Sequence, residues 1–174
     1  MRLTADVLLS VRGALNSLQD RECVLRDLSI PAIENLAVLQ DQFDHIDLTD
    51  NEVMKLENLP PMKRLSSIFL VNNSVSRISK VLGQMVPRLK VVDLTGNQLR
   101  YLSEVRNLAE FKELEHLSLC GNPVIHKPLY RLFMLYCIPS LKFLDFQRIT
   151  AQEREDAKKV FEGRKGEEVM KAVD

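Results

Sequence analysis

The stretch LKVVDLTGN, residues 89–97, decides the fold, because its pattern of apolar and polar positions occurs four times in the chain. The pattern is LxxLxLxxN, in which x is any residue and other apolar residues can replace leucine. The other copies are FDHIDLTDN at 43–51, LSSIFLVNN at 65–73 and LEHLSLCGN at 114–122. Successive copies begin about 22 to 25 residues apart, which is the spacing of a structural repeat.

This repeat predicts an α/β fold, a right-handed leucine-rich-repeat solenoid. Each copy supplies one short strand whose leucine-type residues face a shared core, while the x residues face outward on a parallel, concave sheet. We expect helical caps at both ends of the solenoid. The Asn that closes each copy should satisfy backbone groups where the chain turns inward, so we predict a structural role for Asn51, Asn73, Asn97 and Asn122.

The predicted organisation is a single domain, residues 1–163, followed by a charged tail. Within this domain we expect an N-terminal cap over 1–20, repeats over 21–122 and a C-terminal cap over 123–163. The N-terminal cap should be an amphipathic helix, because apolar residues recur at helical spacing at Val7, Val11, Leu15 and Leu18.

The C-terminal cap should contain a last strand and a closing helix. The last strand should hold Leu141, Leu144 and Phe146, and the helix should begin at the capping box TAQE, residues 150–153. Apolar residues become sparse after the two glycines at 163 and 166, so we expect residues 164–174 to be frayed.

Composition narrows the protein class. The net charge is zero, but residues 1–60 hold five Lys and Arg against eleven Asp and Glu, whereas residues 61–141 hold eleven against five. No stretch matches a membrane span or a secretion signal, so we expect a soluble intracellular protein. The three cysteines lack CxxC spacing, which favours buried thiols over disulfides or a metal site.

Blocks outside the repeats narrow the family. IPAIENL at 30–36, DQFDHIDLTDNE at 41–52 and YRLFMLYCIPSLKFLD at 130–145 together resemble the A-prime proteins of the U2 small nuclear ribonucleoprotein, over essentially the whole chain. The resemblance implies a noncatalytic nuclear scaffold in pre-mRNA splicing, with no cofactor. Such a scaffold clamps a helix of a B-double-prime-like RNA-recognition-domain partner on its concave sheet and helps that partner recognise a U2 RNA stem-loop.

The concave sheet is the predicted partner-binding site. Strand alternation aligns the outward residues of successive repeats in columns, and one column places Asp47 and Asp93 two strands, about 10 Å, apart. That separation suits Lys or Arg on successive turns of one partner helix, and exposed apolar groups nearby suit an apolar anchor. The predicted partner-binding residues are Glu22, Val24, His45, Asp47, Phe69, Val71, Val91, Asp93 and His116. Asp145 either extends this site or supports a local turn.

Direct RNA contact is a second hypothesis, limited to phosphates and without base readout. The candidates are Arg26 at the groove edge, Arg148 near the last strand, and Lys127 and Arg131 in the cap. For Lys127 and Arg131 the alternative is a solvated helix start.

The residues give no basis for predicting an enzyme or a metal site. His45 and His116 share a column but lie three strands, about 14 Å, apart, too far to share a metal ion. No phosphate-binding loop motif occurs, and no nucleophile has a predictable base beside it. Two rival functions stay open: a leucine-rich-repeat regulatory subunit of a phosphatase or another enzyme, and an RNA-binding protein that needs no partner.

Overall fold

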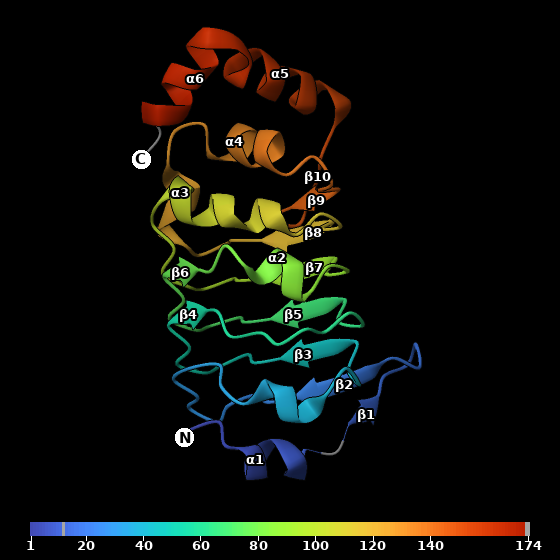
Figure 1. Cartoon of the computed structure of the whole chain (residues 1–174). Helices are drawn as coiled ribbons and strands as arrows, with labels where there is room; N and C mark the ends of the chain where they lie inside the picture. Colours follow the sequence, from blue (N-terminus) through green and yellow to red (C-terminus); the bar gives the residue numbers. More distant parts are fainter. Residues whose placement is uncertain (12, 173–174) are drawn as a thin grey trace.

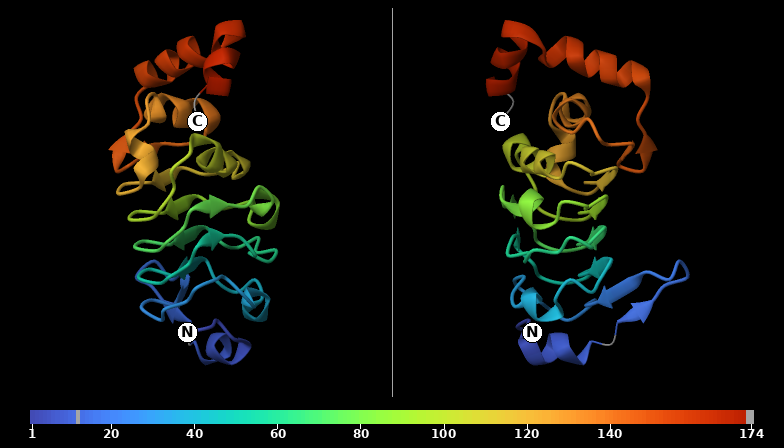
Figure 2. Two further views of the ribbon diagram at one scale, coloured as in Figure 1. Left: turned by 90° about the vertical axis from the view of Figure 1, so that its left-hand side faces the viewer. Right: turned by 45° about the vertical axis from the view of Figure 1, so that its right-hand side comes forward.

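The computed structural model describes residues 1–11 and 13–172, and for residues 14, 164 and 165 it describes the backbone only. The chain forms a curved stack of turns with the N-terminus at one end and the C-terminal helices at the other (Figure 1). Each central turn places one strand in a long sheet and returns along the other side of the stack through a short helix or an extended segment (Figure 2).

The long sheet has eight strands in the order β1-β2-β3-β5-β7-β8-β9-β10. Strands β2 to β9 pair in parallel, as predicted, whereas β1 and β10 add an antiparallel strand at each end. The strands are β1 (Ala14–Leu15), β2 (Arg21–Val24), β3 (His45–Asp47), β5 (Ser67–Phe69), β7 (Val91–Asp93), β8 (His116–Ser118), β9 (Phe143–Leu144) and β10 (Gln147–Arg148).

The other side of the stack carries a second, two-stranded parallel sheet and several short helices. The second sheet pairs β4 (Lys55–Leu56) with β6 (Arg77–Ile78). The short helices are η1 (Leu36–Leu39), α2 (Leu82–Met85), α3 (Leu102–Val105), η2 (Arg106–Glu110) and η3 (Pro123–His126). One continuous hydrophobic core lies between the two sides, and the leucine-type positions of the repeat are buried in it, as at Leu89, Val92 and Leu94.

The repeated asparagines join neighbouring turns, which confirms their predicted structural role. Asn97 is 1% exposed, and its Oδ1 accepts from the Val75 N–H at 2.8 Å. Its Nδ2 donates to the Leu70 carbonyl at 2.8 Å and to the Leu94 carbonyl at 2.9 Å. Asn51, Asn73 and Asn122 make equivalent bonds. Each amide therefore pairs backbone groups of two turns that would otherwise be buried and unsatisfied.

The residue before each of these asparagines has a positive φ. The angles are 56° at Asp50, 53° at Asn72, 69° at Gly96 and 72° at Gly121. Gly adopts this left-handed conformation freely, and Asn and Asp tolerate it better than other residues. The pairs DN, NN, GN and GN in the four copies therefore encode the turn.

The N-terminal cap differs from the predicted single helix. Helix α1 covers only Ala5–Ser10 and is capped by Thr4, whose side chain accepts from the Val7 N–H at 3.3 Å. The chain then turns back as the β1–β2 hairpin, which projects from the stack (Figure 2). Leu15 and Leu18 are 60% and 77% exposed, so the helical prediction was wrong for them. Their spacing fits a helix, but pairing with β2 extends the sheet instead.

The C-terminal cap consists of α4 (Tyr130–Cys137), α5 (Ala151–Phe161) and α6 (Gly163–Ala172). The predicted capping box at Thr150 and Glu153 is present. The prediction of a frayed tail from residue 164 was wrong up to residue 172, because α6 is formed there and packs on α5, with Val169 and Met170 against the core. The last two residues of that predicted tail lie outside the described residues.

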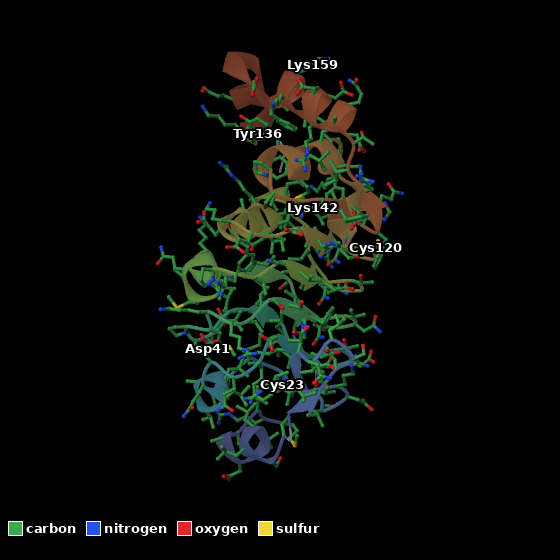
Figure 3. All side chains as sticks on the ribbon, turned by 90° about the vertical axis from the view of Figure 1, so that its right-hand side faces the viewer. Cys23, Asp41, Cys120, Tyr136, Lys142 and Lys159 are labelled. Carbon is green, nitrogen blue, oxygen red and sulfur yellow. The ribbon has the colours of Figure 1, made fainter. Side chains whose placement is uncertain are left out.

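The cysteines are free thiols. Cys23 and Cys120 belong to separate turns of the solenoid (Figure 3), and Cys137 lies in α4. Burial raises the pKa of Cys23 to about 12 and that of Cys137 to about 11, so both stay protonated at neutral pH. Among the described residues, no helix is long and apolar enough to cross a membrane.

A candidate binding groove on the concave sheet

The strand register aligns the outward residues in the predicted columns. The first column is Glu22, His45, Ser67, Val91, His116 and Phe143, and the second is Val24, Asp47, Phe69, Asp93 and Ser118. Because successive strands are about 4.8 Å apart, Asp47 and Asp93 are two spacings apart and His45 and His116 three, as expected. Among the described residues, no three His, Cys, Asp or Glu side chains are placed to hold a metal ion.

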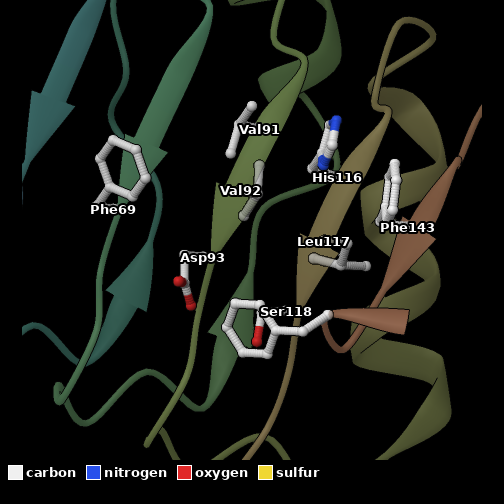
Figure 4. A pocket seen from close by; sticks show the side chains of 9 residues that line it. Phe69, Val91, Val92, Asp93, His116, Leu117, Ser118 and Phe143 are labelled. Atoms are coloured by element: carbon white, nitrogen blue, oxygen red, sulfur yellow. The ribbon is translucent and has the colours of Figure 1, made fainter. Parts of the chain in front are cut away.

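An apolar hollow of about 360 Å³ lies at the C-terminal half of this face. The His116 and Phe143 rings stack on neighbouring strands, with centroids 4.8 Å apart and an interplanar angle of 9°. Phe69 and Val91 line the same hollow (Figure 4). This exposed cluster of aromatic and apolar groups can accept an apolar side chain from another molecule.

Phe146 also lines the hollow, although it was predicted to lie in the last strand with Leu141 and Leu144. That strand ends at Leu144, and Asp145 and Phe146 form a two-residue turn into β10 with φ values of 53° and 62°. The turn leaves Phe146 73% exposed. A left-handed Phe costs about 1–2 kcal/mol, and such conformations cluster at functional sites. Only the turn-forming Asp145 signals this arrangement in the sequence, because Phe gives no sign of a positive φ.

The two aspartates of the second column have different environments. Asp47 is 1% exposed; its Oδ2 accepts from Arg26 Nε at 2.6 Å and its Oδ1 from the Thr49 N–H at 2.9 Å. It therefore already has a cationic partner, so the structure does not support the predicted pairing of Asp47 with a cation of another molecule. Its pairing holds the more exposed Arg26 side chain at the groove edge.

Asp93 is the open carboxylate of the groove. It is half-buried beside the apolar hollow, and its Oδ1 accepts from the N–H of Thr95 at 2.9 Å and from the Thr95 hydroxyl at 2.6 Å. Its Oδ2 accepts no hydrogen bond from any residue that the structure describes. An incoming Lys or Arg can therefore pair with Asp93 without displacing a cation.

Asp145 supports the fold, which was one of the two expected alternatives. Its Oδ1 accepts from the Leu119 N–H at 2.7 Å, and its Oδ2 accepts from the Tyr130 hydroxyl at 2.9 Å. Burial and this neighbouring carboxylate raise the pKa of Tyr130 above its usual value, so the phenol remains a donor. Asp145 thus ties the last turn of the sheet to α4.

The remaining groove candidates lie toward the N-terminal end. Val24 is 43% exposed on β2, next to the half-buried Glu22 position. His45 lies beside Asp20, with 3.2 Å between His45 Nε2 and Asp20 Oδ2, and its Nδ1 is buried without a partner among the described residues. Val71 is half-buried just after β5.

The four RNA-contact candidates are not brought together. Arg131 pairs with Glu153 at 2.7 Å and donates to the Leu144 carbonyl at 3.2 Å, so its guanidinium joins α4 to α5 and is not a free phosphate ligand. Arg148 is exposed on β10. Lys127 lies away from the groove, with its Nζ 5.7 Å from the centroid of the Tyr101 ring.

Comparison with known proteins identifies relatives over the whole chain. The sequence profile of the leucine-rich-repeat family matches residues 1–174. The human U2 small nuclear ribonucleoprotein A' is 40% identical over 173 residues, which cover 99% of this chain and 68% of the relative. The Arabidopsis thaliana U2 small nuclear ribonucleoprotein A' is 42% identical, with 99% and 70% covered. A chain in the crystal structure of the Drosophila melanogaster SNF/U2A' complex superimposes with a TM-score of 0.93 at 42% identity, covering 99% of both chains.

Proposed function

We propose a function whose premise is that the chain belongs to the leucine-rich-repeat family of U2 small nuclear ribonucleoprotein A' proteins. On this premise the protein is a scaffold of the spliceosome and acts in pre-mRNA splicing in the nucleus. It works by holding other molecules in place, with no catalytic step of its own and no cofactor.

The partner is an RNA-recognition-domain protein of the SNF or B-double-prime kind. The observation that carries this proposal is the close structural similarity to a chain of the SNF/U2A' complex, at a TM-score of 0.93 over 99% of both chains. A fold that similar, at 42% identity, presents its concave columns at equivalent places. The U2 RNA stem-loop is then held mainly by the partner, and the scaffold sharpens the partner's choice of RNA.

The groove contributes two kinds of contact to this complex. The hollow formed by Phe69, His116 and Phe143 takes an apolar side chain from a partner helix, and Phe146 stands beside it. Asp93 pairs with a Lys or Arg on the same helix. A buried apolar anchor with a neighbouring charge pair is how a small part of an interface supplies most of the affinity.

RNA contact by the scaffold itself is confined to phosphates at the groove edges. Arg26, held by Asp47, and the exposed Arg148 are the residues that we assign to it. Phosphate contacts position a nucleic acid without reading its sequence. We therefore expect the isolated chain to bind a U2 stem-loop weakly and the complex to bind it tightly.

Titration calorimetry of the full chain with an RNA-recognition-domain protein of this kind tests the proposal. We expect binding by the wild-type chain and strong loss of affinity when Phe69→Ala and Asp93→Lys are combined. Unchanged affinity in that double variant would contradict the groove assignment. Capture of the chain with a phosphatase or another enzyme, and without U2 RNA, would favour the regulatory-subunit alternative.

A further inference from the structure

Six basic side chains form a strip on the side of the solenoid that carries β4 and β6, away from the long sheet (Figures 1 and 2). They come from successive turns of the middle of the chain, where basic residues outnumber acidic ones. We call this surface the basic strip, and its members are Lys55, Arg77, Lys80, Arg100, Arg106 and Lys127.

One half of the basic strip is continuous through direct neighbours. Lys55 and Arg77 are paired residues of β4 and β6, and both are exposed. Arg77 and Arg100 line one hollow of about 250 Å³ together with Tyr101. Tyr101 is 53% exposed, and Lys127 Nζ lies 5.7 Å from its ring centroid.

The other half surrounds a larger, polar hollow of about 720 Å³. Lys80, Arg106 and Asn107 line it. Asn107 also connects the two halves, because its Nδ2 donates to the carbonyl of Ile78, the residue after Arg77, at 2.8 Å.

The positive charge of the basic strip is largely unpaired. Elsewhere, exposed cations form short ion pairs, such as Arg64 with Asp44 at 2.7 Å and Lys142 with Glu115 at 2.9 Å. In the strip, Lys55 lies 3.9 Å from Glu57. For the other five members, no carboxylate lies within 4.0 Å among the residues that the structure describes.

Two carboxylates line the hollows but do not cancel this charge. A Glu104 oxygen accepts from the Ile78 N–H at 3.3 Å, and Glu110 lies 3.9 Å from Lys112, which is outside the strip. Six cations therefore face solvent on one side with little local compensation, which favours a polyanionic ligand.

We propose that the basic strip binds the sugar–phosphate backbone of an RNA strand that runs along the solenoid axis. Successive turns repeat at about 4.8 Å, the same order as the rise of about 3.4 Å per nucleotide along one strand of a duplex. Arginine pairs well with phosphate, and Tyr101 offers a face for a base. The strip is separate from the groove, and its assignment takes from the proposed function only that the particle contains RNA.

A double charge reversal, Arg77→Glu with Arg100→Glu, tests this site in the full chain. Its matched control is Lys63→Glu with Arg88→Glu, which makes the same charge change at two exposed residues before β5 and β7. The probe is a labelled uridine homopolymer, and the readout is fluorescence anisotropy over a salt series. We expect the strip variant to lose about tenfold in affinity and to flatten the salt dependence by about 0.7 per lost contact.

Three results would overturn the site: no loss in the strip variant, an equal loss in the control, or tighter strip-dependent binding of polyglutamate than of RNA. The last would identify an acidic protein as the ligand. Arg77→Gln with Arg100→Gln repeats the test should the reversal unfold the chain. Calorimetry with the groove partner is run on the same variants and should be unchanged, so a failure of the strip and a failure of the groove are seen separately.

Discussion

Asp47 and Arg26 form an ion pair within the concave sheet, with Arg26 Nε 2.6 Å from Asp47 Oδ2. Asp93 occupies the same column two strands away, in the same local sequence DLT, yet no cation lies beside its carboxylate among the described residues. Two aspartates that are equivalent in the repeat therefore differ in role. Asp47 stabilises the sheet and orients Arg26, while Asp93 is open to another molecule.

Asp47→Asn should lower the free energy of unfolding by about 1–3 kcal/mol, because it removes a charged acceptor from the Arg26 guanidinium inside the sheet. Asp93→Asn should change the free energy of unfolding by less than about 0.5 kcal/mol, since its Oδ2 has no partner to lose. Urea unfolding of both variants measures the difference. Equal stability of the two variants would refute the assignment of separate roles.

Asp93→Lys should weaken partner binding by about 2 kcal/mol or more, because it replaces an attraction to a partner cation by a repulsion. Titration calorimetry measures the change. Glu113→Lys is the control, as it makes the same charge change at an exposed position outside the groove. If the two variants lose the same affinity, the effect is one of net charge and Asp93 has no specific contact.

Phe69→Ala should cost on the order of 2 kcal/mol in partner binding, because Phe69 lines the apolar hollow and would anchor the partner there. The substituted chain should still fold, since Phe69 is only half-buried. Calorimetry and circular dichroism on the same sample distinguish the two effects. Loss of folding in place of binding would show that Phe69 belongs to the core.

Phe146→Gly should raise stability while it weakens partner binding. Gly adopts the φ of 62° without the cost of about 1–2 kcal/mol that a side chain carries there, so the free energy of unfolding should rise by up to about 1 kcal/mol. The loss of an exposed ring from the hollow should lower the affinity. Thermal unfolding and calorimetry give the two numbers, and a Gly variant that binds as well as the wild type would remove Phe146 from the site.

The sequence predicts the repeated parts of this fold well, because there one rule applies many times. The position of Asn97, the burial of Leu94 and the outward direction of Asp93 all follow from the template and from strand alternation. The ends of the solenoid are harder to predict. Leu15 and Leu18 fit a helical pattern, but the open edge of β2 binds them as a hairpin.

The chemistry of the groove is predicted less well than its geometry. Sequence alone places Asp47 on the concave face but does not show that Arg26 reaches across to it from the neighbouring strand. Likewise, Phe146 leaves the core because the chain turns after Leu144. Both outcomes depend on side-chain reach and on one backbone conformation, neither of which a hydrophobic pattern contains.

The contact between α4 and α5 should make stability depend on pH through Glu153. Hydrogen bonds from Arg131 and from the N-cap residue Thr150 lower the pKa of Glu153 from 4.5 to about 2. Because the folded state holds this carboxylate ionised, its contribution is complete above pH 4.5 and is lost as the pH falls toward 2. Glu153→Gln should therefore reduce stability at neutral pH and flatten its decline across that window. Thermal unfolding between neutral pH and pH 2 checks this, with the exposed Glu155→Gln on the same helix as the control, and parallel curves for the wild type and the Glu153 variant would disprove the linkage.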